Sequence, residues 1–133
     1  IDVTYCDKDA NRAESIARKH ISQYYVSVLE HYEFLADYHR GTKGYESYAA
    51  AVEIIKAAGK EQSLEDYVNV QAYGTPQQIL DKLEARRKVV GDFEWLIMGS
   101  YAGLPHKDVE ASMELIGKEV LPEVKSWGID SAA

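Results

Sequence analysis

One run of the sequence, from Tyr73 to Val124, constrains the fold more than any other, because it predicts a helix, a buried strand and a second helix in succession. Thr75 places a capping hydroxyl directly before Pro76, and proline is favoured at the first position of a helix. The predicted helix ends at Gly91. Its apolar residues fall on roughly one stripe and are Ile79, Leu80, Leu83, Val89 and Val90.

The strand expected at Phe93–Met98 contains four consecutive apolar residues, which is typical of a parallel strand covered by helices on both faces. Such a strand needs neighbours on each side, and this chain offers few candidates. A glycine-bounded loop from Gly99 to Gly103 follows, and a last helix is expected from about His106. Its predicted buried face contains Val109, Met113, Ile116, Val120 and Val124.

The first residues predict a short strand, because Ile1, Val3 and Tyr5 alternate with polar residues. Asp7 or Asp9 can then cap a helix. Apolar residues recur at helical spacing as far as Leu35, which predicts a helix of about 28 residues and a length of ~42 Å. A polar break at residues 37–44 ends this helix.

A shorter helix is expected at Tyr45–Ala58, with Gly59 as its C-terminal stop. Ser63 with Asp66 resembles a capping box for a short helix or irregular segment that reaches Tyr73. The predicted fold class is therefore α/β and mostly helical, with two short strands. We expect a single unit over residues 1–133: a strand and helices at 1–72, a helix-strand-helix at 73–127 and a tail at 128–133.

The composition indicates a globular chain, with 46% hydrophobic and 28% charged residues. A net charge of −7 argues against nucleic-acid binding, and no apolar run approaches the ~20 residues that span a bilayer. The single cysteine, Cys6, excludes an internal disulfide and is expected to be a small apolar residue. These features predict a cytoplasmic protein. The basic residues expected on solvated helix faces and ends are Lys56, Lys60, Arg86, Arg87 and Lys88.

Common catalytic patterns are missing from the sequence. His20 and His31 share a helix face but stand ~16 Å apart, too far for one metal ion. Ser100 lacks the glycine spacing of a nucleophile elbow, and no Gly-Lys-Ser/Thr phosphate loop occurs. We therefore expect no metal site and assign no catalytic residue.

The loop after the predicted strand at 93–98 is one candidate site. Loops at the carboxyl ends of barrel strands bind ligands, and glycine permits close backbone approach. Gly99, Ser100 and Tyr101 are therefore candidate cofactor-binding residues. A plain turn is an equally acceptable interpretation.

The second candidate is aromatic, because six of the ten tyrosines fall between residues 24 and 48. Tyr38, His39 and Tyr45 are candidate substrate-binding residues, since tyrosine rings and hydroxyls can line and orient a planar or apolar substrate. Packing in the core is the favoured alternative for an aromatic stripe at helical spacing. The six tyrosines are Tyr24, Tyr25, Tyr32, Tyr38, Tyr45 and Tyr48.

Several motifs together resemble those of the bacterial luciferase-like flavin-dependent monooxygenases. They are Gly74-Thr75-Pro76-Gln77-Gln78, Gly103-Leu104-Pro105-His106 and Glu119-Val120-Leu121-Pro122, with an upstream stretch at residues 27–34 and 42–46 that is similar to the family's helical insertion. Each motif is modest, but their order and spacing extend over nearly the whole chain.

The resemblance implies a (β/α)8 TIM-type barrel that binds reduced FMN, or in some relatives a reduced deazaflavin, at its C-terminal mouth. Such enzymes transfer one oxygen atom from dioxygen to a small organic substrate, and a separate flavin reductase usually supplies the reduced flavin. A barrel of this type needs ~250 residues and eight strands. The 133 residues here would form its C-terminal portion, which lacks the N-terminal half of the barrel.

We therefore expect the isolated chain to be inactive and to hold no FMN. Two alternatives stay open. The chain could be a helical interaction module without catalytic activity, and its uncovered strand edge would then favour a homo-oligomer. It could also be a complete enzyme whose copies reassemble a barrel.

Overall fold

The computed structural model of the chain describes residues 1–33 and 41–128. Within these ranges the chain is mostly helical, with two short strands, β1 (Asp2–Val3) and β2 (Ile97–Met98). The strands pair in parallel, with Asp2 opposite Ile97 and Val3 opposite Met98. This confirms the predicted α/β, mostly helical class.

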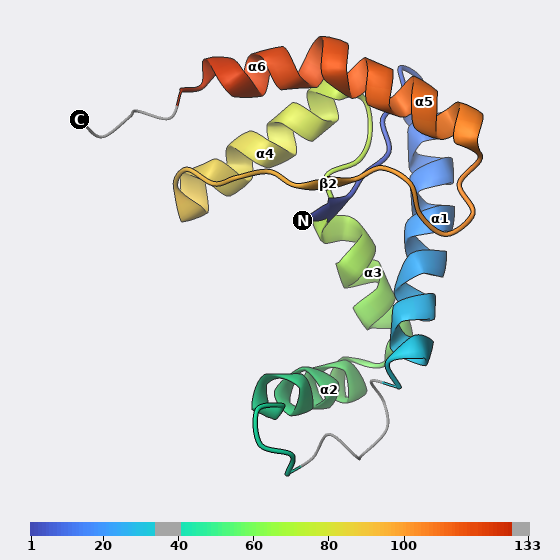
Figure 1. Cartoon of the computed structure of the whole chain (residues 1–133), viewed down its shortest axis with the longest axis vertical. Helices are drawn as coiled ribbons and strands as arrows, with labels where there is room; N and C mark the ends of the chain where they lie inside the picture. Colours follow the sequence, from blue (N-terminus) through green and yellow to red (C-terminus); the bar gives the residue numbers. More distant parts are fainter. Residues whose placement is uncertain (34–40, 129–133) are drawn as a thin grey trace. The chain divides into compact units, whose positions relative to one another are not determined.

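Helical segments make up most of the rest of the described chain (Figure 1). They are α1 (Ala10–His31), α2 (Glu46–Ala58), α3 (Lys60–Val70), α4 (Pro76–Val90), α5 (His106–Leu115), the π-helix η2 (Ile116–Val120) and α6 (Leu121–Ser126).

These elements form two compact units. Unit 1 contains Ile1–Ile21 and the described residues from Gln71 onward, and unit 2 contains Ser22–Val70. In unit 2 the rings of Tyr25 and Tyr67 stack with centroids 4.5 Å apart. The small core of unit 2 contains Tyr25, Leu29, Val52 and Val68.

In unit 1, both edges of the first strand segment are covered. On one edge, the backbone N–H groups of Asp2 and Thr4 donate to carbonyls of β2 and the residue before it. On the other edge, Gly74 donates to the Tyr5 carbonyl and accepts from the Asp7 N–H, and the two segments form a parallel bridge at Cys6 and Gly74. The spatial order is therefore 71–74, 2–7, 96–98. In a barrel, by contrast, each strand lies beside the strands that come before and after it in the chain.

The core of unit 1 is formed by apolar residues of α4 and η2 together with residues of the chain after β1 and before α4. Its buried members are Cys6, Ala72, Ile79, Leu83, Ile116 and Val120. Trp95, Ile97 and Trp127 pack against this cluster. The expectation that Cys6 is a small apolar residue is confirmed, since its side chain is buried in this core.

The first long helix begins as predicted but ends early. The Asp9 carboxylate accepts hydrogen bonds from the N–H groups of Asn11 and Arg12, so it caps α1. The helix ends at His31, and Glu33 adopts a left-handed φ of 47°. The predicted length of about 28 residues is therefore wrong, because α1 has 22.

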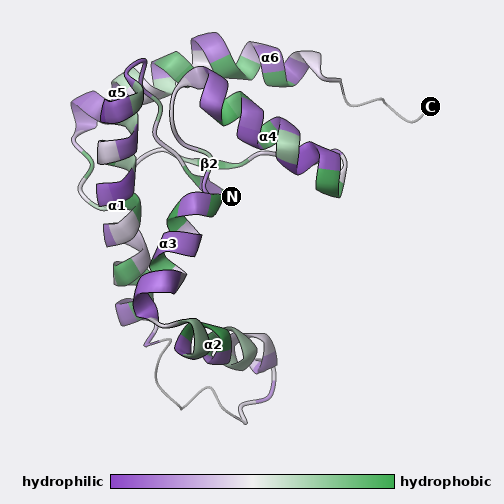
Figure 2. Cartoon of the chain, turned by 180° about the vertical axis from the view of Figure 1, so that it is seen from behind, coloured by the Kyte–Doolittle hydropathy of each residue, from purple (hydrophilic) through white to green (hydrophobic). Residues whose placement is uncertain are grey.

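The predicted ends of the fourth helix are confirmed, but its predicted apolar stripe is only partly buried. Thr75 and Gln78 form a reciprocal capping box, Pro76 begins the helix and Gly91 follows its end at a φ of 79°. Val89 and Val90, however, are 84% and 62% exposed. The end of α4 is green, and therefore hydrophobic, in Figure 2 although it lies outside the core.

The capping box predicted at Ser63 and Asp66 is wrong. Helix α3 already begins at Lys60, so Ser63 lies inside it. The Ser63 hydroxyl donates to the Lys60 carbonyl, a back-bond to the preceding turn that competes with capping. Of the two alternatives predicted before Tyr73, a short helix or an irregular segment, the helix is confirmed, and it has 11 residues.

The last helix is one continuous rod formed by α5, η2 and α6 (Figure 1). Its predicted buried face is correct at Ile116 and Val120 but wrong at Met113, which is 41% exposed. Ser112 is buried instead, and its hydroxyl accepts a hydrogen bond from the Cys6 N–H. The π-helix lies just before Pro122, whose missing N–H interrupts the regular hydrogen-bond ladder.

Candidate functional site

The loop after β2 turns one of its three candidate residues outward. Ser100 is exposed, whereas Tyr101 is only 7% exposed. Gly99 lies against Met113, because a Cβ on this glycine would be 2.6 Å from the Met113 sulfur. Of the three, Ser100 therefore has the side chain that can reach a ligand, while Gly99 and Tyr101 hold the loop against the protein.

A histidine fixes the next part of this loop. The Nδ1 atom of His20, on the unit 1 part of α1, lies 3.0 Å from the Ala102 carbonyl oxygen. Ala102 has a φ of 44°, and the Leu104 N–H donates to the Tyr101 carbonyl in the same turn. His20, which is only 8% exposed, therefore positions the loop. In the sequence, His20 stands out only as a possible metal ligand, a role that its distance from His31 excludes.

A polar cluster that sequence reasoning missed lies at the carboxyl end of the first strand segment. Arg12 donates to the Tyr5 hydroxyl at 2.8 Å and to the Asp108 carboxylate at 2.6 Å. It also pairs with Asp7, and the Tyr5 hydroxyl donates to the same carboxylate at 3.2 Å. Asp7 was considered only as a helix cap. Its place directly after a predicted strand was the available signal for a polar cluster at the strand end.

The pKa shifts in this region indicate groups that keep one charge state. Burial raises the pKa of Tyr5 to about 12 and that of the Cys6 thiol to about 12. Burial also opposes ionisation of Asp7, but hydrogen bonds from the Asp9 N–H and from Arg12 leave the Asp7 pKa below its usual value. At neutral pH the cluster therefore contains a neutral phenol and thiol beside a carboxylate. It positions the strand end and supplies no general base.

The opposite end of the strands holds a buried carboxylate. Asp2 is 2% exposed and accepts hydrogen bonds from Arg86 at 2.7 and 3.1 Å, from the Trp95 indole at 2.8 Å and from the Ala72 N–H at 2.9 Å. Burial raises the pKa of Asp2, but these donors outweigh it and the pKa is lowered. Asp2 is therefore ionised at neutral pH and ties together β1, α4 and the chains before α4 and β2.

The interpretation of Arg86 and Arg87 as solvated residues is wrong. Arg86 neutralises Asp2, and its guanidinium lies 5.9 Å from the centre of the Phe93 ring. Arg87 donates to the Asp92 carboxylate at 2.7 Å and to the Trp127 carbonyl at 3.2 Å. Both arginines hold distant parts of unit 1 together.

Lys82 adds a further contact at this amino end. Its ammonium donates to the Gln71 carbonyl at 2.6 Å and lies 4.7 Å above the centre of the Tyr73 ring. Burial lowers the pKa of Lys82. The Gln71 side chain in turn accepts from the Val3 N–H. The whole amino end is therefore a network of buried, paired polar groups.

The aromatic candidates are only partly described. Tyr38 and His39 lie outside the described residues. Tyr45 directly precedes α2, is 45% exposed and has its ring 5.6 Å from that of Tyr48. The expectation of core packing is confirmed for Tyr25, which is buried, and is wrong for Tyr32, which is 57% exposed.

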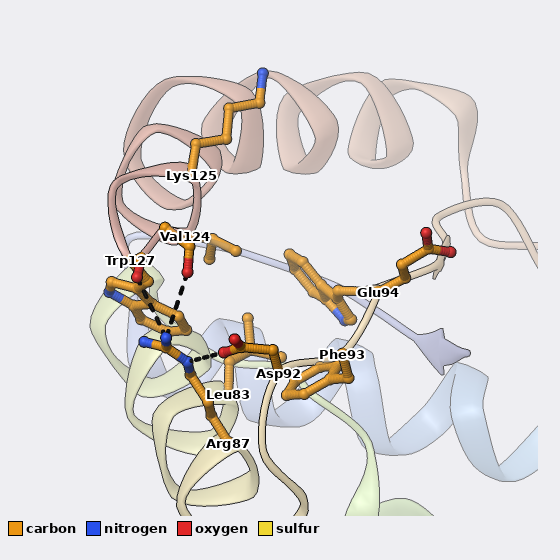
Figure 3. Close-up of a pocket in the computed structure, with 10 residues that line it drawn as sticks. Leu83, Arg87, Asp92, Phe93, Glu94, Val124, Lys125 and Trp127 are labelled. Carbon is orange, nitrogen blue, oxygen red and sulfur yellow. Dashed lines mark hydrogen bonds and ion pairs between the residues drawn. The ribbon is translucent and has the colours of Figure 1, made fainter. Parts of the chain in front are cut away.

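One hollow in unit 1 lies between α4, α6 and the chain before β2 (Figure 3). It has a volume of about 630 Å³. Phe93, Trp95 and Trp127 form its aromatic walls, and Arg87, Asp92 and Lys125 are among its polar residues. Several lining residues belong to the chain that leads into β2. The hollow therefore lies toward the amino end of β2, away from the loop at Gly99–Gly103 that follows its carboxyl end.

The described residues contain neither a metal-binding group of side chains nor a helix that could span a membrane. Across residues 1–33 and 41–128, no group of three or more histidine, cysteine, aspartate or glutamate side chains could hold a metal ion. No helix in the described parts of the chain is long and apolar enough to cross a membrane. In comparisons with known proteins, no family model, curated protein or solved structure matches this chain.

Proposed function

We propose that this chain is the C-terminal portion of a luciferase-like flavin-dependent monooxygenase, which transfers one oxygen atom from dioxygen to a small organic substrate. The observation that carries the proposal is the loop at Gly99–Gly103, which directly follows a parallel strand and exposes Ser100. Ligand sites of α/β barrels are built from such loops at the carboxyl ends of strands. The sequence motifs around Thr75, Pro105 and Pro122 are the reason for proposing this family.

In this proposal the loop faces reduced FMN, or a reduced deazaflavin. The exposed Ser100 hydroxyl reaches the cofactor, while Gly99, which lies against Met113, and the buried Tyr101 support the turn. The bound flavin supplies the oxidation chemistry, and the protein residues orient it and exclude water. Tyr38, His39 and Tyr45 are kept as candidate substrate-binding residues, and a separate flavin reductase is the proposed partner.

Two cations at the carboxyl end of the first strand segment, Arg12 and Lys8, are already paired. A flavin phosphate needs a positive partner or several backbone N–H groups. Arg12 is paired with Asp7 and Asp108, and Lys8 is paired with Glu119 at 3.2 Å. These side chains therefore offer no uncompensated charge, and the phosphate contacts would come from the N-terminal half of the barrel.

The strand order adds a structural requirement to the proposal. In a complete barrel, residues 71–74 would lie between residues 1–5 and 93–98, because neighbours in sequence are neighbours in the sheet. Here residues 2–7 occupy the middle. The proposal therefore expects the 93–98 strand to pair with residues 71–74 once the remaining strands are present.

The experiment that tests the proposal is an oxygen-uptake assay with reduced flavin. If the reading frame continues upstream of the Ile1 codon for about 150 residues, as a barrel requires, the longer product should consume oxygen with reduced FMN and an organic substrate. The 133-residue chain should not. A longer product without flavin-dependent uptake above the free-flavin background would contradict the proposal.

The second candidate function is a helical interaction module without catalytic activity. The observation that favours it is the exposure of large apolar side chains in unit 2, where Ile54 is 69% and Val70 is 59% exposed. Such side chains mark a protein contact where they form a contiguous apolar surface. Sedimentation of the chain would test it, because a concentration-independent 15.0 kDa monomer would count against self-association.

A further inference from the structure

The walls of the hollow in unit 1 are aromatic, and hydrogen bonds to other residues orient two of the rings. The Trp95 indole donates to the buried Asp2 carboxylate at 2.8 Å, and the Trp127 indole donates to Glu123 at 3.2 Å. Both rings are thereby oriented before any ligand binds. Phe93, which is 36% exposed, forms another aromatic wall of the same hollow.

The indole N–H groups and the Arg87 guanidinium at the hollow already donate within the protein. Both indole N–H groups donate within the protein, as described, and the Arg87 guanidinium donates to Asp92, to the Trp127 carbonyl and to the Gly128 carbonyl at 3.4 Å (Figure 3). The aromatic walls therefore offer ring surface rather than hydrogen-bond donors. A ligand would be recognised mainly by stacking and apolar contact.

The charges that line the hollow cancel. Arg87 and Lys125 are opposed by Asp92 and Glu94, and the Arg87 charge is directly paired with Asp92 at 2.7 Å. An anionic or cationic ligand would gain little net attraction and would lose hydration on entry. This balance favours a ligand without net charge.

We propose that this hollow is a binding site for a flat, uncharged aromatic molecule. Its volume of about 630 Å³ lies within the usual range of small-molecule sites, and its rings are preorganised for stacking. The proposal does not depend on the proposed flavin function. The hollow lies toward the amino end of β2, whereas the loop proposed to face flavin follows its carboxyl end.

The experiment uses two probes with the same rings. N-phenyl-1-naphthylamine is uncharged, and 8-anilinonaphthalene-1-sulfonate carries a sulfonate. Both tryptophans of the chain line the hollow, so quenching of tryptophan fluorescence reports binding there. The neutral probe should bind one molecule per chain, about tenfold or more tightly than the sulfonate, because an anion loses its hydration without gaining a partner.

Two variants test the stacking and the charge balance. Phe93→Ala should weaken binding of the neutral probe by about fivefold, the usual size of one aromatic contact. Leu96→Ala, the matched control at an exposed residue outside the lining, should leave the affinity unchanged. Asp92→Asn leaves the Arg87 charge uncompensated and should strengthen sulfonate binding, whereas Asp81→Asn, on the helix that carries Arg87, should not.

Three results would overturn the proposal. The first is equal affinity for the two probes, and the second is equal loss in Phe93→Ala and Leu96→Ala, since either indicates general adsorption to apolar surface. The third is a hollow closed by a second copy of the chain, seen as probe binding that disappears as the chain self-associates in sedimentation. Circular dichroism of each variant must match that of the parent, and Asp92→Asn supplies an independent test should Phe93→Ala unfold.

Discussion

The two ends of the strands in unit 1 use their charged residues differently. At the amino end Asp2 is 2% exposed and accepts from a guanidinium, an indole and a backbone N–H. At the carboxyl end Arg12 bridges two carboxylates with its side chain 46% exposed, and Ser100 faces outward. Burial thus makes the amino end costly to change, while exposure leaves the carboxyl end free to contact a ligand.

This difference agrees with a general difference between the two strand ends in parallel α/β proteins. Polar residues at the amino ends of strands mainly determine stability, and loops at the carboxyl ends carry function. The comparison predicts large losses of stability from substitutions around Asp2 and small ones around Arg12.

The largest effect is expected for Asp2→Ala, which leaves Arg86, Trp95 and the Ala72 N–H without their acceptor. Removing one partner of a buried ion pair costs roughly 3–5 kcal/mol. Urea unfolding followed by circular dichroism should show this loss. Asp81→Ala on an exposed face of α4 is the control, and a loss below ~1 kcal/mol for Asp2→Ala would contradict the ranking.

Part of the same stability should depend on pH. Because the folded-state pKa values of Asp2 and Asp7 lie below their usual values, their contribution is complete above the unfolded pKa, near 3.8, and is lost as the pH falls through the folded pKa. Thermal unfolding from neutral pH down to acid should show a falling Tm. The acid-dependent part should shrink in Asp2→Asn. An unchanged slope in that variant would show that other groups are responsible.

An intermediate effect is expected for Gly74→Ala. Gly74 has a φ of 131°, and an added Cβ would lie 2.6 Å from the Gln78 side-chain oxygen that forms the capping box. Such backbone strain costs about 1–3 kcal/mol. Gly99→Ala is the comparison variant without such strain, because the only close neighbour of an added Cβ there is the flexible Met113 side chain. Chemical denaturation should separate the two variants, and equal losses would contradict the account.

The smallest effect is expected for Arg12→Gln. Its ion pairs with Asp7 and Asp108 are half exposed, so water and salt screen them and the loss should not exceed ~1 kcal/mol. Unfolding measured at low and high salt should show the difference between parent and variant shrinking with salt. A loss as large as that of Asp2→Ala would remove the distinction between the two ends.

Local features of the fold could be predicted from the sequence because neighbouring residues determine them. Thr75, Pro76 and Gly91 mark the ends of α4 correctly, and Asp9 caps α1. The pairing of Asp2 with Arg86 joins residues 84 positions apart, and no local pattern encodes it. For the same reason, the place of residues 2–7 between 71–74 and 96–98 could not be predicted.

At the candidate site, too, local features could be predicted from the sequence, whereas features that depend on long-range contacts could not. The loop after β2 could be located from its glycines, but the burial of Tyr101 and the exposure of Ser100 depend on contacts with other elements. The shift of the buried face from Met113 to Ser112 also depends on tertiary packing. The π-helix is an exception, since Pro122 in the middle of an apolar helical pattern was a readable local signal.

The most direct test of the central claim is a titration with FMN of the 133-residue chain and of the longer product encoded by the frame upstream of the Ile1 codon. The account predicts that the longer product binds FMN with a changed flavin absorbance, and that the 133-residue chain causes no change at micromolar concentrations. Micromolar binding by the short chain, or no binding by the longer product, would contradict it.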